Sequence, residues 1–259
     1  MRIILILIVV LFSSLCRAQD SEQLLYDAYL ETEMHVWENY LDTSDWNNAT
    51  IEERTLLLNY EYGYTAHVIS IKQDDAKEVL SSFENHLEAH KAYMDSGVYY
   101  TYKTGLCSYK LALEKKQITK QIKGIYEYIQ RAGEISPQDP FVLSMQGNVE
   151  FFNPLFGSKQ KALRYYQQAD SIYHLMQHNY PRWNIRALQI TLVQSLGKTG
   201  QKAAARALNL FKNTTAKIKV LPSELEGLIN QIENGQQGNR TQCCVYCKNL
   251  AQAKALSIL

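Results

Sequence analysis

The sequence has little of the residues that mark specialised protein classes. Its 259 residues include 5 Cys, 5 Pro and 12 Gly, while 46% are apolar and 20% are charged. These fractions are those of ordinary globular proteins, which excludes collagen-like and disordered chains. The chain also has no large excess of either charge, because it contains 27 Lys and Arg and 26 Asp and Glu. Without a basic excess, we expect no nucleic-acid partner.

The first 18 residues have the parts of a secretory signal peptide. Arg2 precedes the one long apolar run, Ile3 to Phe12, and the small residue Ala18 precedes the expected cleavage site. A membrane-spanning helix needs about 20 apolar residues, so this run predicts export rather than a membrane anchor. Removal of Arg2 and Arg17 leaves 25 basic against 26 acidic residues, and we expect no transmembrane segment in the mature chain.

Apolar residues recur at three- and four-residue steps through most of the mature chain, which predicts helices. The expected helices are 20–41, 50–72, 74–97, 98–115, 118–132, 141–152, 158–178, 183–196, 201–218 and 223–232. The clearest apolar stripe consists of Ala76, Leu80, Phe83, Leu87, His90 and Met94. Thr50 and Glu53 have the spacing of a capping box, and Ser96-Gly97 is expected to end its helix in a left-handed cap.

The lengths of these helices and loops predict the fold class. No run of alternating β-branched residues indicates a strand. Helices joined by short loops pack as antiparallel pairs, and such pairs can stack. The sequence therefore predicts an all-α domain of stacked antiparallel helical hairpins over residues 19–233. The composition of residues 234–259 predicts a flexible linker followed by a Cys-containing tail.

The middle of the chain resembles the tetratricopeptide repeat (TPR), which places a small residue in its first helix and Ala, an aromatic residue and Ala in its second. Gly147 occupies the first-helix position, and the second-helix spacing is carried by Ala162, Tyr166 and Ala169. The preceding unit contributes Ile125, Ile129, Ala132 and Pro137. The sequence departs from the family pattern in two ways. Ala162 follows Gly147 by 15 residues instead of 12, and His174 occupies the position where the family has Pro.

The resemblance covers residues 120–220 and implies a degenerate TPR-like α-solenoid. Residues 151–163 also look like the inter-helix loop of exported bacterial TPR-like proteins. The family implies a non-catalytic scaffold that binds a protein or peptide partner in the cell envelope. The expected location is the periplasm, with an extracellular protein and an outer-membrane lipoprotein as alternatives. Acylation of Cys16 would need a small residue before it, and Leu15 is not small.

Tyrosine is unusually frequent, with 18 Tyr against 7 Phe. A ring with a hydroxyl suits both the hydrated edge of helix packing and a binding groove, and both interpretations stay open. The candidate binding residues are Phe152, Phe156, Tyr166 and Trp183. The alternative to a protein partner is a small solute, enclosed in an aromatic pocket under the 153–158 loop.

Two histidine pairs, His86/His90 and His174/His178, have the four-residue spacing of metal ligands on one helix face. Neither pair has Glu directly after its first His, as the zinc proteases require. The sequence also lacks a nucleophile elbow, a phosphate-binding loop and a dinucleotide fingerprint. We therefore expect no enzyme, no cofactor and no metal. A hydrolase assembled from acids or histidines of separate helices is the third hypothesis.

Four cysteines remain in the mature chain and are candidates for disulfides in an exported protein. They are Cys107, Cys243, Cys244 and Cys247. Cys244 and Cys247 have the spacing of zinc ligands, but no second pair completes a tetrahedral site. Free thiols are the other interpretation.

Overall fold

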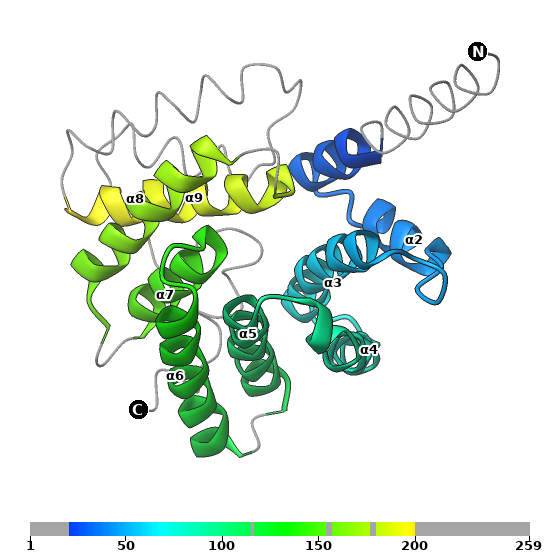
Figure 1. Ribbon diagram of the computed structural model, residues 1–259, viewed down its shortest axis with the longest axis horizontal. Coiled ribbons are helices and arrows are strands. Elements are labelled where there is room, and N and C mark those ends of the chain that lie inside the picture. The colour runs from blue at the N-terminus through cyan, green and yellow to red at the C-terminus, as the bar shows by residue number, and fades with distance from the viewer. Residues whose placement is uncertain (1–20, 115–116, 154–156, 177–179, 200–259) are drawn as a thin grey trace, which may run out of the picture.

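A computed structural model describes residues 21–199 apart from 115–116, 154–156 and 177–179 (Figure 1). The helices in chain order are residues 21–31, α2 (His35–Thr43), α3 (Ile51–Ile71), α4 (Ala76–His90), the 3₁₀ helix η1 (Lys91–Tyr93), α5 (Ser96–Glu114), α6 (Ile118–Ile135), α7 (Pro140–Phe152), α8 (Lys159–Leu175) and α9 (Arg182–Thr199). No strand occurs among these residues, which confirms the all-α class. None of the helices in this part of the chain is long and apolar enough to cross a membrane.

Several predictions made from the sequence lie outside the described residues. They are the signal peptide, the helices expected at 201–218 and 223–232, and the linker and tail at 234–259.

The N-terminal ends of four helices, α3, α5, α7 and α8, are capped by short polar side chains. The capping box predicted for α3 is confirmed: Thr50 Oγ1 accepts from the Glu53 N–H at 3.2 Å, and Glu53 Oε2 accepts from the Thr50 N–H at 2.8 Å. Asp139 accepts from two backbone N–H groups at the start of α7. These bonds satisfy donors that have no partner within the helix.

Asp95 caps α5, and this overturns the prediction that Ser96-Gly97 ends a helix. The Asp95 carboxylate accepts from the N–H groups of Gly97 at 2.8 Å and Val98 at 3.2 Å. The preceding helix α4 already ends at His90. Gly97 therefore lies in the first turn of α5. It was predicted to end the preceding helix only because glycine is common at helix C-termini.

The single helix predicted over residues 20–41 is also wrong, because the chain breaks at Thr32. Thr32 adopts a left-handed φ of 61°, and the Glu33 N–H bonds the carbonyl oxygen of Ala28 at 2.9 Å. This is the pattern that ends many helices, although a β-branched residue is unusual there. The break turns α2 back, so that Trp37 Nε1 donates to the Leu25 carbonyl oxygen at 2.7 Å.

Successive helices form three hairpins, α3–α4, α5–α6 and α7–α8, as Figure 1 shows. The first helices of these hairpins also pack on one another, α3 on α5 and α5 on α7, and α7 then contacts α9. The second helix of each hairpin packs against the first helix of the following unit. The described part of the chain is therefore a stack of hairpins in which α3, α5, α7 and α9 form one inner layer.

A glycine lies in the first helix of each hairpin, at Gly63, Gly105 and Gly147, with 42 residues between successive members. Each lies under an aromatic ring. A Cβ atom would stand 2.7 Å from Trp37 at the first glycine, 2.5 Å from Tyr62 at the second and 2.3 Å from Tyr166 at the third. No side chain fits at these distances, so glycine allows the ring and the helix to approach.

The two ends of the described stack contact each other. Arg182, at the start of α9, forms an ion pair with Glu22 at 3.3 Å and covers the ring of Tyr26. Trp183 packs edge-on against Trp37, with ring centroids 5.4 Å apart. Figure 1 accordingly shows residues 21–31, in dark blue, beside the start of α9 in yellow. In an open solenoid each unit contacts only its neighbours. The contact between the N-terminal helices and α9 joins units that are not neighbours in the chain.

Candidate functional site: a central cavity and an outer groove

The inner layer of helices surrounds a small central cavity. Its volume is about 90 Å³, and α3, α5, α7, α8 and α9 all contribute to its lining. Aromatic side chains dominate the wall: Tyr62, Tyr109, Phe141, Tyr173 and Trp183. Four polar side chains interrupt it: Ser144, Asn148, Asn184 and Thr191. In the described part of the chain, no ionisable acid or base lines the cavity apart from the tyrosines, so this lining carries no charge at neutral pH.

The rings are held by their own hydrogen bonds. Tyr109 donates its hydroxyl to the Tyr62 carbonyl oxygen at 3.2 Å. Tyr166, behind the cavity wall, donates to the Asn148 side-chain oxygen at 2.8 Å. Burial raises the pKa of Tyr173 well above its ordinary value, so its hydroxyl stays protonated at neutral pH. These contacts fix the wall before any ligand binds.

The four residues predicted to bind a partner occupy different places. Trp183 lines the central cavity, and Phe152 lines a smaller neighbouring cavity of about 30 Å³. Tyr166 is fully buried between α7 and α8 against Gly147. The three share the interior rather than a surface groove, and Phe156 lies outside the described residues.

We compared this chain with known protein families, curated proteins and solved structures. None of them matches.

An open groove lies on the outer side of the stack, between α6, α7 and α8. Its volume is about 550 Å³. Ile129 and Val149 line it together with the rings of Tyr126 and Tyr165, and the Asn153 amide donates to the Tyr126 hydroxyl. The groove thus combines an apolar surface with exposed polar edges.

The polar edges of this outer groove carry amides and carboxylates. They are contributed by Gln130, Glu134, Gln146, Glu150 and Lys161. Glu150 is neutralised in part, because it lies 3.5 Å from Lys161 and accepts the Ser158 N–H at 2.8 Å. Glu134 accepts only the Gln130 amide, at 2.9 Å, among the contacts described for it. The groove therefore has an excess of one negative charge.

Glu61 and His86 form a polar pair that sequence reasoning missed. Both carboxylate oxygens of Glu61 lie 3.0 Å from His86 Nδ1, although Glu61 is only 6% exposed. The His86 ring stacks on Trp46, with centroids 3.8 Å apart. The sequence could have indicated this pair, because Glu61 lies on the buried face of α3 and buried carboxylates are almost always paired. The stacking of Trp46 on His86 joins the loop between α2 and α3 to α4.

His90 belongs to the packed stripe of α4 rather than to a site with His86. Its Nε2 lies 2.9 Å from Thr55 Oγ1, and that hydroxyl donates its one hydrogen to the Ile51 carbonyl oxygen at 2.8 Å. His90 Nε2 must therefore be the donor. Burial lowers the pKa of His90, with a further lowering by Arg54, so the ring is held neutral.

The structure describes some of the residues predicted as metal ligands or disulfide partners. Within the described ranges, no group of three or more His, Cys, Asp or Glu could hold a metal ion. Cys107 is a buried free thiol on α5, and burial raises its pKa. His178 and the three other cysteines lie outside the described residues.

Proposed function

We propose that this chain is an exported, non-catalytic scaffold of TPR-like helical hairpins that binds a segment of a protein partner in the cell envelope, with the periplasm as its location. The signal-peptide pattern at residues 1–18 supports export. The stacked hairpins, with Gly147 under Tyr166 and Ala162 and Ala169 fully buried beside it, support the repeat interpretation. Stacked hairpins commonly present extended surfaces to peptides.

The observation that carries the proposal is the open outer groove between α6, α7 and α8. The inner layer, where a solenoid would offer its concave surface, encloses only about 90 Å³. The outer groove is about six times larger and has apolar rings in its floor and amides on its edges. Amide side chains can bond the N–H and C=O groups of an extended peptide, and the rings can cover apolar side chains.

The charge of the groove selects among partner segments. Glu134 is exposed, and no cation among the described residues is paired with it. A partner segment with a Lys or Arg next to an apolar side chain would complement this edge. We therefore assign the outer groove to a short basic and apolar segment of an envelope protein.

Site-specific crosslinking tests the assignment. A photoreactive phenylalanine at Gln130 should crosslink one defined partner in envelope fractions, whereas the same group at Tyr93, on η1 away from the groove, should not. The identified partner, once purified, should bind Glu134→Lys at least tenfold more weakly than wild type. Glu127→Lys is the matched control, because Glu127 lies on the same helix, is 61% exposed and does not line the groove.

Two results would refute the groove as the binding surface. One is the same set of crosslinked proteins from both positions. The other is equal affinity of the purified partner for Glu134→Lys and Glu127→Lys.

A further inference from the structure

We infer that the central cavity is a binding site for a small, uncharged, flat ring that carries a hydrogen-bond donor and an acceptor on neighbouring atoms, as a cyclic amide does. The site is separate from the outer groove and does not depend on the scaffold proposal.

The amide of Asn184 is the recognition group. Asn184 lines the cavity from α9 and is 6% exposed. Its amide oxygen and its amide nitrogen are both buried, and neither forms a hydrogen bond to the described residues. The Tyr173 hydroxyl stands near this amide but does not form a hydrogen bond of normal geometry with it. A buried polar atom without a partner costs about 1–3 kcal/mol, so this donor and acceptor favour occupation by a polar molecule.

The chemistry of an amide defines the complementary edge. Asn184 offers an N–H donor beside a C=O acceptor. A cyclic amide presents the same two groups in the opposite order, so it can form two hydrogen bonds with Asn184 at once. A ketone or an ether could form only one, and the other amide atom would stay unsatisfied.

The walls define the body of the ligand. Trp183, Tyr62 and Phe141 offer ring surfaces, and Met145 and Leu188 complete the apolar lining. A flat ring packs well between such surfaces. The volume of about 90 Å³ allows on the order of six non-hydrogen atoms, if about 15 Å³ is taken for each water-sized group. The ligand is therefore a single ring and not a peptide.

The lining also decides the charge of the ligand. Among the residues that the structure describes, no Asp, Glu, Lys, Arg or His lines the cavity. An ion would lose its hydration there without gaining a counter-ion, which is unfavourable by several kcal/mol. Carboxylates, amines and phosphates are therefore excluded as ligands, and a neutral ring remains.

Ordered water is the competing occupant, because water also satisfies buried amides. The probe that separates the two is 2-pyridone, a flat cyclic amide of about the right size. 2-Fluoropyridine is the control probe, since it keeps the flat ring, the number of non-hydrogen atoms and an acceptor nitrogen but has no N–H donor. Binding is measured on the full mature chain by the change in tryptophan fluorescence and by the rise in melting temperature.

We expect 2-pyridone to bind wild type saturably, with a Kd below about 10 mM. 2-Fluoropyridine should bind at least tenfold more weakly. Asn184→Leu, which keeps the size of the side chain, should also lose at least tenfold in affinity for 2-pyridone. Asn39→Leu is the matched variant: it makes the same substitution at an exposed position of α2 that does not line the cavity, and it should bind as wild type does.

Three outcomes would overturn the inference. The first is no saturable binding of 2-pyridone, which would leave water as the occupant. The second is equal binding of both probes to wild type, which would show an apolar cavity without recognition by the amide. The third is unchanged affinity in Asn184→Leu. If this variant does not fold, the difference in affinity of wild type for the two probes still tests the inference.

Discussion

Trp37 and Tyr60 fill the space between the helices of the N-terminal half, whereas the helices of the α7–α8 hairpin meet over Gly147, Ala162 and Ala169. In the first region, the ring centroids of Trp37 and Tyr60 lie 4.8 Å apart, edge to face. In the second, the Tyr166 ring lies on Gly147, and the Phe151 ring lies beside it with centroids 6.3 Å apart. Both regions place a ring on a glycine, Trp37 on Gly63 and Tyr166 on Gly147, but only the α7–α8 contact adds two buried alanines, Ala162 and Ala169.

The difference shows where a binding cavity can form. Rigid rings from several helices rarely fill space completely, and the cavity of about 90 Å³ lies where rings from α3, α5, α7, α8 and α9 meet. Gly and Ala at a helix contact let the backbones approach and leave no such space. The aromatic region therefore carries the candidate ligand site, and the α7–α8 hairpin forms one wall of it.

The largest expected effect comes from removing the central ring of the N-terminal half. Trp37→Ala deletes a fully buried side chain and the bond from its Nε1 to the Leu25 carbonyl oxygen. We expect a loss of about 3–5 kcal/mol in the free energy of unfolding, measured by urea denaturation at pH 7. Tyr93→Ala, at a ring that is 55% exposed, is the control and should change stability by about 0.5 kcal/mol or less. Similar losses in both variants would contradict a core centred on Trp37.

A smaller effect is expected from adding one methyl group to the close-packed hairpin. In Gly147→Ala the new Cβ would lie 2.3 Å from Tyr166 Cε1, and the fully buried ring has no room to move. We expect a loss of about 1–3 kcal/mol from overpacking, even though Ala favours helix by about 1 kcal/mol. The measurement is the midpoint and slope of urea unfolding.

Gly133→Ala is the matched control for this substitution. There the new Cβ would meet only the end of the Gln146 side chain, which can turn into the outer groove. The helix preference of Ala should then dominate, and stability should stay equal or rise by up to about 1 kcal/mol. Equal losses at both glycines would show that the distance to Tyr166 is not the cause.

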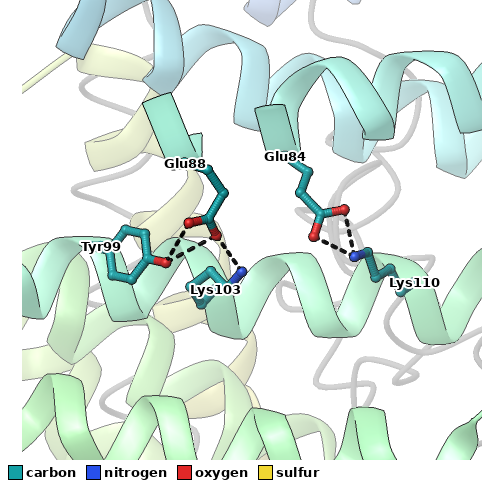
Figure 2. Close-up of polar contacts among 5 residues, drawn as sticks. All are labelled: Glu84, Glu88, Tyr99, Lys103 and Lys110. Atoms are coloured by element: carbon teal, nitrogen blue, oxygen red, sulfur yellow. Dashed lines mark hydrogen bonds and ion pairs between the residues drawn. The ribbon is translucent and has the colours of Figure 1, made fainter. Parts of the chain in front are cut away.

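The smallest effect is expected from the ion pairs between α4 and α5, which Figure 2 shows. Lys103 Nζ lies 2.6 Å from Glu88 Oε1, and the Tyr99 hydroxyl donates to the same carboxylate at 3.0 Å. Burial opposes ionisation of Glu88, but the bonds from Lys103 and Tyr99 outweigh it and lower its pKa. Because Glu88 is partly exposed, Lys103→Met should cost about 1 kcal/mol or less at pH 7.

The pH dependence of this loss gives a sharper test. The pKa of Glu88 is lower in the folded chain than in the unfolded chain, so its contribution is present above the unfolded value, about 4.5. The contribution disappears as pH falls through the lower, folded value. The stability difference between wild type and Lys103→Met should therefore shrink as unfolding is measured at decreasing pH below 4.5. A constant difference from pH 7 to pH 3 would show that Lys103 acts by packing and not by charge.

Local patterns in the sequence predict local structure well in this chain. The stripe of α4, the capping box of Thr50 and the spacing of Ala162, Tyr166 and Ala169 all describe contacts within one helix or one hairpin. Such contacts depend on residues a few positions apart, which the sequence displays directly. The break at Thr32 escaped prediction because a β-branched residue gives no signal for a left-handed turn.

The candidate sites depend on contacts that no local pattern displays. Trp183 was predicted as a binding residue because it is a large ring, but its place in the cavity follows from its packing against Trp37 and Gly63, more than 100 positions away. Asn184 was not singled out, because nothing near it in the sequence shows that its amide would be buried. The spacing of 42 residues between Gly63 and Gly105 was present in the sequence, and its meaning depends on the rings that cover them.

The contact of Arg182 with Glu22 and Tyr26 constrains the order of folding. A linear array of hairpins can begin to fold at any unit and extend from there. Here the helix at 21–31 is made early in synthesis, yet its partner on α9 follows some 160 residues later. Closing so long a loop is slow relative to forming a hairpin. We therefore expect the first helix to dock last, onto an α9 that is already packed against α7 and α8.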